Sequence, residues 1–181
     1  GADVLATKDA LIALGADIEK TASGDWQVAG VGLHGMISPA TPLDLGNSGT
    51  GVRLLMGVVA GQNITATFVG DASLSSRPMA RITTPLAAIG ASIASREGQL
   101  PVTITGTPTP MARQHQSQVA SAQIKSAILL AGLNARGMTE IIEPHASRDH
   151  SESMLRYFGA DVQQNIADDG RHIIRLQGEA E

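Results

Sequence analysis

The sequence predicts an α/β domain in which helices pack inside and sheets cover them outside, with pseudo-threefold symmetry. Three segments repeat one pattern: an amphipathic run, a Gly-Ala step and two strands. Between these segments lie two helical stretches that are apolar on nearly every side, which is typical of helices in a core. With 181 residues, of which 43% are hydrophobic and 17% charged, the chain can build the core of one ordinary domain.

The three copies of the repeated pattern are centred on Gly15, Gly90 and Gly159. Each glycine stands where a helix is expected to end and the chain to turn into a strand, a position that favours a left-handed residue. Two strands are expected after each of these steps. Three matching copies predict that the chain is built from one repeated unit.

A second pattern fills the space between the copies. The apolar helix expected over 52–60 is followed by a strand over 64–69, and the helix expected over 124–133 is followed by a strand over 140–142. A full unit is therefore β-α-β-α-β-β, roughly 70 residues long.

We interpret residues 1–181 as a single substrate-binding domain that is incomplete. Residues 42–106 and 116–178 form full units, whereas residues 1–35 form only the second half of one. By this count we expect about 40 further residues, carrying a strand, a helix and a strand, upstream of Gly1. The absence of an initiator Met also indicates an excised piece.

The composition argues against several classes of function. A net charge of -4 and an aromatic content of 2% disfavour nucleic acid and anionic membranes as partners. The absence of Cys excludes disulfides, thiolate metal sites and a cysteine nucleophile. The five His show no metal-ligand spacing, so we expect no metal site. No signal peptide or membrane-length apolar run is present, so the expected location is cytoplasmic.

Two helix starts are candidate anion-binding sites, because free N–H groups and the positive end of the helix dipole attract anions. The first is Gly-rich and holds Asn47, Gly49, Thr50 and Arg53. The second, in the next unit, holds Ser121, Ala122 and Gln123. Ordinary N-capping, by Ser48 in the first case, is the alternative at both places. The first stretch lacks the Walker lysine and its spacing, so it is not a P-loop.

Two junctions between a strand and a helix carry an arginine. Arg77 precedes a proline that fits the first helical turn, so its guanidinium is a candidate clamp for a carboxylate or phosphate. Ser147 and Arg148 occupy the equivalent junction in the next unit. Asp149 and Glu152 there predict a capping pair. A simply solvated arginine is the alternative.

Four segments together resemble the 3-phosphoshikimate 1-carboxyvinyltransferase (EPSP synthase) family. They are 45–50 with Arg53, 70–79, 120–126 and 147–150. The resemblance extends over about residues 3–178, and the Ser-Ala-Gln and Arg-Asp-His forms are most similar to the bacterial subgroup that includes glyphosate-tolerant enzymes.

The resemblance implies a two-domain enzyme with the inside-out α/β fold of enolpyruvyl transferases, each domain built from three units. Shikimate 3-phosphate and phosphoenolpyruvate would bind between the domains. The enolpyruvyl group would pass to the 5-hydroxyl of shikimate 3-phosphate, a step of the shikimate pathway of aromatic amino acid biosynthesis. The reaction would need no cofactor.

The resemblance also implies roles for particular residues. Shikimate 3-phosphate would be bound by Ser121, Ala122, Gln123, Ser147 and Arg148. Phosphoenolpyruvate, or the inhibitor glyphosate, would be lined by Gly49, Arg77 and Gln123, with support from Asn47, Thr50 and Arg53. We expect no catalytic residue here, because the family's Lys-Ser segment would lie upstream and its acid/base residues in the missing second domain. The chain alone is therefore expected to bind substrate without turnover.

Position 49 carries a further implication. In glyphosate-tolerant members of the family an Ala stands at this position and intrudes on glyphosate, whereas this chain has Gly49. The resemblance therefore implies a glyphosate pocket that is sterically open at this point.

Two other functions stay open. A UDP-N-acetylglucosamine enolpyruvyl transferase-like domain would share the fold, but its usual catalytic Cys is missing here. A non-catalytic interaction module would bind a complementary fragment through its exposed face. Binding of shikimate 3-phosphate would distinguish these two alternatives from the enzyme domain that the resemblance implies.

Overall fold

The computed structural model describes residues 1–179. Its helices are α1 (Ala2–Ala13), α2 (Gly49–Ala60), α3 (Ala72–Ser75), α4 (Ala80–Ile89), α5 (Ala122–Gly132) and α6 (His150–Tyr157). The first strands are β1 (Asp17–Lys20), β2 (Trp26–Ala29), β3 (Leu43–Asp44), β4 (Thr65–Val69) and β5 (Ser92–Arg96). They are followed by β6 (Gln99–Thr105), β7 (Gln114–Gln116), β8 (Gly137–Glu143), β9 (Asp161–Ile166) and β10 (His172–Gly178).

The two four-stranded sheets have the same topology. Their strand orders are β3-β4-β6-β5 and β7-β8-β10-β9. In each sheet the first pair is parallel and the other two pairs are antiparallel. Along the chain, both sheets arise from strand, helix, strand, helix, strand, strand, with the short α3 added in the first. The repeated β-α-β-α-β-β unit is therefore confirmed.

The Gly-Ala steps end helices as the sequence predicts. Gly15, Gly90 and Gly159 have φ angles of 105°, 120° and 92°. A side chain at any of these positions would be strained, because L-residues rarely adopt positive φ. The same glycine therefore turns the chain from helix to strand in all three copies.

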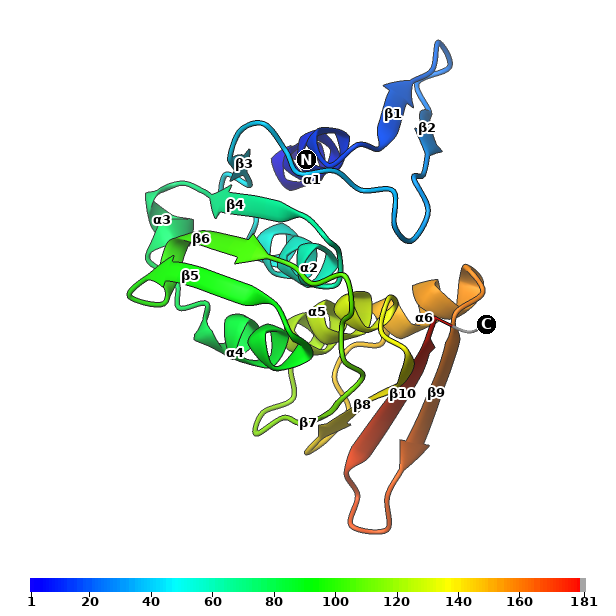
Figure 1. Cartoon of the computed structure of the whole chain (residues 1–181). Coiled ribbons are helices and arrows are strands. Elements are labelled where there is room, and N and C mark those ends of the chain that lie inside the picture. Colours follow the sequence, from blue (N-terminus) through cyan, green and yellow to red (C-terminus); the bar gives the residue numbers. More distant parts are fainter. Residues whose placement is uncertain (180–181) are drawn as a thin grey trace.

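The helices α2 and α5 form the centre of the molecule, and the two four-stranded sheets lie outside them (Figure 1). The backbones of α2 and α5 approach each other closely at two glycines. A Cβ on Gly57 would collide with the carbonyl oxygen of Ala127, and a Cβ on Gly61 would lie 2.6 Å from the carbonyl oxygen of Ala131. Outward residues of β6 alternate with buried ones such as Val102 and Ile104. Helices inside and sheets outside are thus confirmed.

The N-terminal segment contributes α1 and the β1–β2 hairpin, which projects away from the two sheets in Figure 1. Ala10 and Leu14 of this segment are buried in the common core. The Leu33 carbonyl oxygen accepts from Gln62 Nε2 at 2.5 Å and from Asn134 Nδ2 at 3.1 Å. These two bonds tie the N-terminal segment to the C-terminal ends of α2 and α5.

Two local predictions are wrong. Pro78 does not stand in the first turn of a helix, because α4 begins at Ala80 after its N-cap residue Met79. Asp149 and Glu152 do not form a capping pair, since Asp149 makes no side-chain cap bond. Glu152 instead points inward and is fully buried, where an ammonium group provides a stronger partner than a helix-start amide.

Candidate functional site

The starts of the two central helices are joined by one side chain. Gln123, in the first turn of α5, donates from Nε2 to Thr50 Oγ1 at 2.8 Å. Its Oε1 accepts a hydrogen bond from the Arg53 guanidinium on α2. Residues that are about 70 positions apart in the chain therefore meet at one place.

Both helix starts are also capped in the ordinary way. Ser48 Oγ accepts from the Gly51 amide at 3.2 Å, and Ser121 Oγ accepts from the Ile124 amide at 3.5 Å. The capping alternative therefore holds for these two hydroxyls. It does not account for the arginines and amides that gather beside them.

Arg77 lies over Gly49 and is held there by a short chain of polar contacts. Its Nη2 donates to Asn47 Oδ1 at 2.7 Å, and Asn47 Nδ2 donates to Asp71 Oδ2 at 2.7 Å. A Cβ added to Gly49 would lie 2.7 Å from Arg77 Nη1 and 3.8 Å from Arg53 Nη1. Two guanidinium groups thus approach the backbone at a helix start, where a larger residue would displace one of them.

The side chains around Gly49 carry mostly positive charge. Partial burial, followed by repulsion from Arg77 and Arg81, lowers the pKa of Arg53 below its usual value. We call Arg53, Arg77 and Arg81 the arginine cluster. Asp71 is the nearby carboxylate, and hydrogen bonds from the Leu74 amide and the Asn47 side chain lower its pKa, with a smaller effect from Arg77. Like charges held together at a helix start favour the binding of an anion.

The other predicted residues line an adjoining cavity. A mainly polar hollow of about 450 Å³, here called the Ser121 cavity, is bordered by Ser121, Ala122, Gln123, Ser147 and Arg148. A smaller neighbouring hollow of about 180 Å³ is bordered by Thr50, Gln123 and Arg148. Gln123 and Arg148 border both hollows, and Gln123 also contacts the arginine cluster. The structure therefore brings all the predicted site residues to one end of the two central helices, while their ligands stay a prediction.

Sequence reasoning missed a buried ionic triad behind the Ser121 cavity. Lys125 Nζ lies 3.3 Å from Glu143 Oε2 and 2.6 Å from Glu152 Oε1. The three side chains are 2%, 1% and 0% exposed. The available signals were a lysine inside a mostly apolar helix and a glutamate that follows two isoleucines at the end of a strand.

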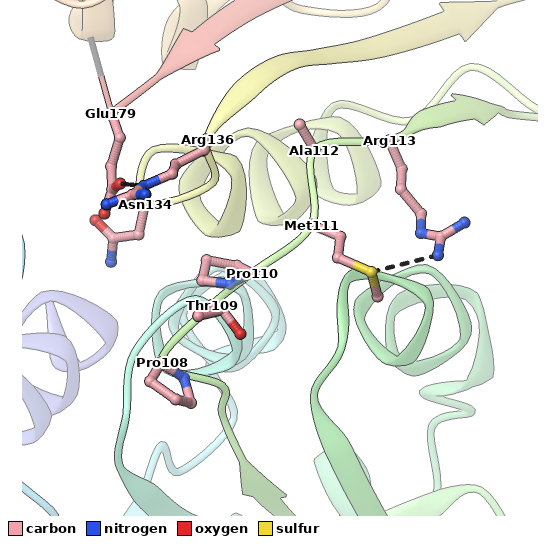
Figure 2. Close-up of a pocket in the computed structure, with 9 residues that line it drawn as sticks. All are labelled: Pro108, Thr109, Pro110, Met111, Ala112, Arg113, Asn134, Arg136 and Glu179. Carbon is pink, nitrogen blue, oxygen red and sulfur yellow. Dashed lines mark hydrogen bonds and ion pairs between the residues drawn. The ribbon is translucent and has the colours of Figure 1, made fainter. Parts of the chain in front are cut away.

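A separate cavity of about 570 Å³ lies near the C-terminal end of α5 (Figure 2). It shares none of its lining residues with the predicted site. Arg136 there pairs with Glu179 at 3.0 Å, and Arg113 donates a weak hydrogen bond to the Met111 sulfur at 3.5 Å. In the described residues no group of three or more acidic or His side chains is placed to hold a metal ion. None of the described helices is long and apolar enough to cross a bilayer.

Comparisons with known proteins point to one family. The family model of EPSP synthase (3-phosphoshikimate 1-carboxyvinyltransferase) matches residues 1–180. The 3-phosphoshikimate 1-carboxyvinyltransferase of Novosphingobium aromaticivorans is 55% identical over the whole chain, and that of Parvibaculum lavamentivorans is 54% identical. The chain spans 41% and 40% of the length of these two relatives.

Solved structures agree with the sequence comparison. An EPSP synthase from Acinetobacter baumannii superposes with a TM-score of 0.89 at 45% identity, over 100% of this chain and 40% of that one. The enolpyruvyl transferase NikO from Streptomyces tendae gives a TM-score of 0.61 at 17% identity over 98% of this chain and 41% of its own, which shows a shared fold. With the family model matched over nearly every residue, the chain belongs to the EPSP synthase (3-phosphoshikimate 1-carboxyvinyltransferase) family.

Proposed function

We propose that this chain is the substrate-binding domain of an enzyme that transfers the enolpyruvyl group of phosphoenolpyruvate to the 5-hydroxyl of shikimate 3-phosphate. The observation that carries the proposal is the junction at Gln123, which joins the arginine cluster to the Ser121 cavity. Two anions must be brought together for this reaction, and each of these places suits one of them. The role would belong to the shikimate pathway.

Shikimate 3-phosphate would occupy the Ser121 cavity. Ser121, Ala122 and Gln123 offer a hydroxyl, helix-start amides and a side-chain amide, and Ser147 and Arg148 border the same space. Such groups match a ligand that carries one phosphate and several hydroxyls. Held in this way, the 5-hydroxyl would be oriented before the reaction.

Phosphoenolpyruvate would bind beside Gly49. Arg77 and Gln123 would contact it, while Asn47, Thr50 and Arg53 hold these two side chains in place. The arginines would neutralise its carboxylate and phosphate and stabilise charge that develops as the phosphate leaves. Glyphosate, a small anion that carries both groups, would compete for the same place.

The acid/base chemistry would come from outside this chain. The 5-hydroxyl loses its proton as its oxygen adds to phosphoenolpyruvate, whose methylene carbon gains a proton. Inorganic phosphate then leaves as the resulting methyl group loses a proton, which restores the double bond. These proton transfers would use groups of the second domain, which would be the partner of this one. The proposed reaction needs no metal or organic cofactor.

Titration of the isotope-labelled chain with shikimate 3-phosphate tests the proposal. We expect amide shifts concentrated at Ser121, Gln123 and Ser147, because these residues border the proposed site. UDP-N-acetylglucosamine at the same concentration should leave the spectrum unchanged. Shifts with UDP-N-acetylglucosamine alone would favour the related enolpyruvyl transferase.

One observation favours an interaction module as the second candidate. An apolar groove of about 630 Å³ runs between α1, the β1–β2 hairpin and α2, with Trp26, Val28 and Leu54 in its lining. Val28 is 61% exposed and Val4, on the same groove, 63%. Patches of this kind commonly mark protein contacts. A spectrum that showed no amide shifts with shikimate 3-phosphate, and shifts only with a complementary protein fragment, would support this candidate.

A further inference from the structure

Glu143 connects the buried triad to both sides of the Ser121 cavity. It is the last residue of β8, and its Oε1 accepts from the Ser121 amide at 2.9 Å. The Ser147 hydroxyl donates to the same carboxylate, at 3.0 Å from Oε1 and 2.8 Å from Oε2. One buried side chain thus holds a helix start and a loop that border the same cavity from different segments.

Lys125 holds Glu143 in place from behind and is itself paired with Glu152. Lys125 on α5 contacts both carboxylates, and Gln164 Nε2 on β9 donates to Glu152 Oε1 at 3.2 Å. Burying a carboxylate is unfavourable unless a cation and hydrogen-bond donors compensate for its charge. Glu143 receives this compensation from Lys125, Ser121 and Ser147 together.

The direction of the Ser147 bond limits what this hydroxyl offers to a ligand. A serine hydroxyl has one proton to donate and lone pairs that accept. Both Glu143 oxygens already face N–H donors, Oε1 the Ser121 amide and Oε2 the Lys125 ammonium, so the Ser147 proton lies between its own oxygen and the carboxylate. Toward the cavity the Ser147 oxygen can then only accept, which suits a hydroxyl of a ligand and disfavours a phosphate oxygen.

We propose that Glu143 is a positioning residue that fixes Ser121 and Ser147, and that it makes Ser147 an acceptor for a hydroxyl group of the ligand. The part that concerns shikimate 3-phosphate rests on the function proposed above. Recognition in the Ser121 cavity is then divided: the helix start and Arg148 face the phosphate, and Ser147 faces a ring hydroxyl.

Two matched variants test the positioning role without any ligand. Glu143→Leu and Glu152→Leu each remove one carboxylate, and each leaves Lys125 with one buried partner. Only Glu143 contacts the site, so we expect the Ser121 amide to exchange its hydrogen roughly tenfold faster or more in Glu143→Leu, beyond any change in Glu152→Leu. Equal exchange of this amide in both folded variants would overturn the positioning role.

Ser147→Ala tests the acceptor role and, because Ser147 lies partly exposed in a loop, the variant should fold. Sulfate serves as the comparison ligand, since it has the charge of a phosphate but no proton to donate. We expect the Kd for shikimate 3-phosphate to rise roughly two- to tenfold and the Kd for sulfate to stay unchanged. A parallel loss for both ligands would mean that Ser147 donates to the anion, and no loss for either would remove it from recognition.

The two tests separate this inference from the proposed function. If the unmodified chain bound no shikimate 3-phosphate, the proposed function would fail. The hydrogen-exchange comparison of Glu143→Leu with Glu152→Leu would still decide whether Glu143 positions Ser121. Sulfate binding to Ser147→Ala would still decide whether the hydroxyl donates to an anion.

Discussion

Gly49 leaves space for a guanidinium, and that space is narrow. The nearest atom to an added Cβ is Arg77 Nη1, at 2.7 Å, which is too close for a real contact. The far end of an arginine can move, so the expected cost falls on the position of the charge rather than on the fold. The residue at this position therefore controls where the Arg77 guanidinium lies, and so where the proposed small anion would meet the arginine cluster.

We predict that Gly49→Ala in the full-length enzyme weakens inhibition by glyphosate. Displacement of Arg77 should raise the inhibition constant roughly tenfold, as for a clash that costs about 1–3 kcal/mol. Gly30→Ala is the control, because a Cβ there meets nothing within 4 Å. Inhibition that stayed the same in Gly49→Ala would show that the pocket is not limited at this point.

We predict that Lys125→Met strongly destabilises the chain. The substitution leaves Glu143 and Glu152 buried without their cation, and breaking such a buried pair typically costs about 3–5 kcal/mol. Urea unfolding followed by circular dichroism measures the loss. Arg171→Met is the control, since its pair with Asp169 is on the surface and should contribute little to stability. Similar losses in the two variants would contradict this account of the triad.

At the scale of elements, β7 contains a titratable group whose burial gives stability a pH dependence. His115 pairs with Ile141 of β8, and desolvation lowers its pKa below the usual 6.5. The unfolded chain therefore takes up a proton before the folded chain does. Above about pH 6.5 the folded and unfolded chains do not differ in proton uptake at this histidine. Stability is lost as the pH falls from there toward the lower pKa of the folded state.

We predict that His115→Gln makes stability less dependent on pH. Between about pH 7.5 and about pH 5 the unmodified chain should lose more of its unfolding free energy than the variant does. Thermal unfolding at several pH values gives the comparison. If the unmodified chain and His115→Gln lost the same unfolding free energy across this pH range, the imidazole would not be desolvated in the folded chain.

Much of the element pattern could be predicted, because it depends on local features that repeat. Gly15, Gly90 and Gly159 each stand at a helix end and adopt positive φ as expected. The short helix α3 and the true start of α4 were missed, since a few polar residues around Pro78 fit several turns equally well. Glu152 was misplaced because a capping motif and a buried ion pair use the same residue type, and only the position of Lys125 decides between them.

At the scale of the whole molecule, the site depends on contacts between distant segments. No local pattern places Gln123 against Thr50 and Arg53, or Asn47 against Arg77. Local patterns marked both helix starts and both arginine junctions as candidate anion sites, and the family resemblance joined them into one site. Glu143 escaped because its role appears only when β8, α5 and the loop around Ser147 are packed together.

We predict that the purified 181-residue chain does not catalyse enolpyruvyl transfer. It spans about 40% of its relatives, and the proposed proton transfers rely on groups outside it. Release of inorganic phosphate from phosphoenolpyruvate in the presence of shikimate 3-phosphate measures turnover, with a full-length relative as the positive control. Turnover by the chain alone would place acid/base residues within it.

The bond between Gln123 and Thr50 joins two copies of one structural unit at equivalent positions. The copies agree in their sheets and glycine turns but differ at the helix starts, with Gly-Thr in one and Ala-Gln in the other. The repeated unit therefore supports two chemically different halves of the candidate site. Selection, natural or in the laboratory, can alter the chemistry of one half through a few residues while the other copy continues to hold the shape of both.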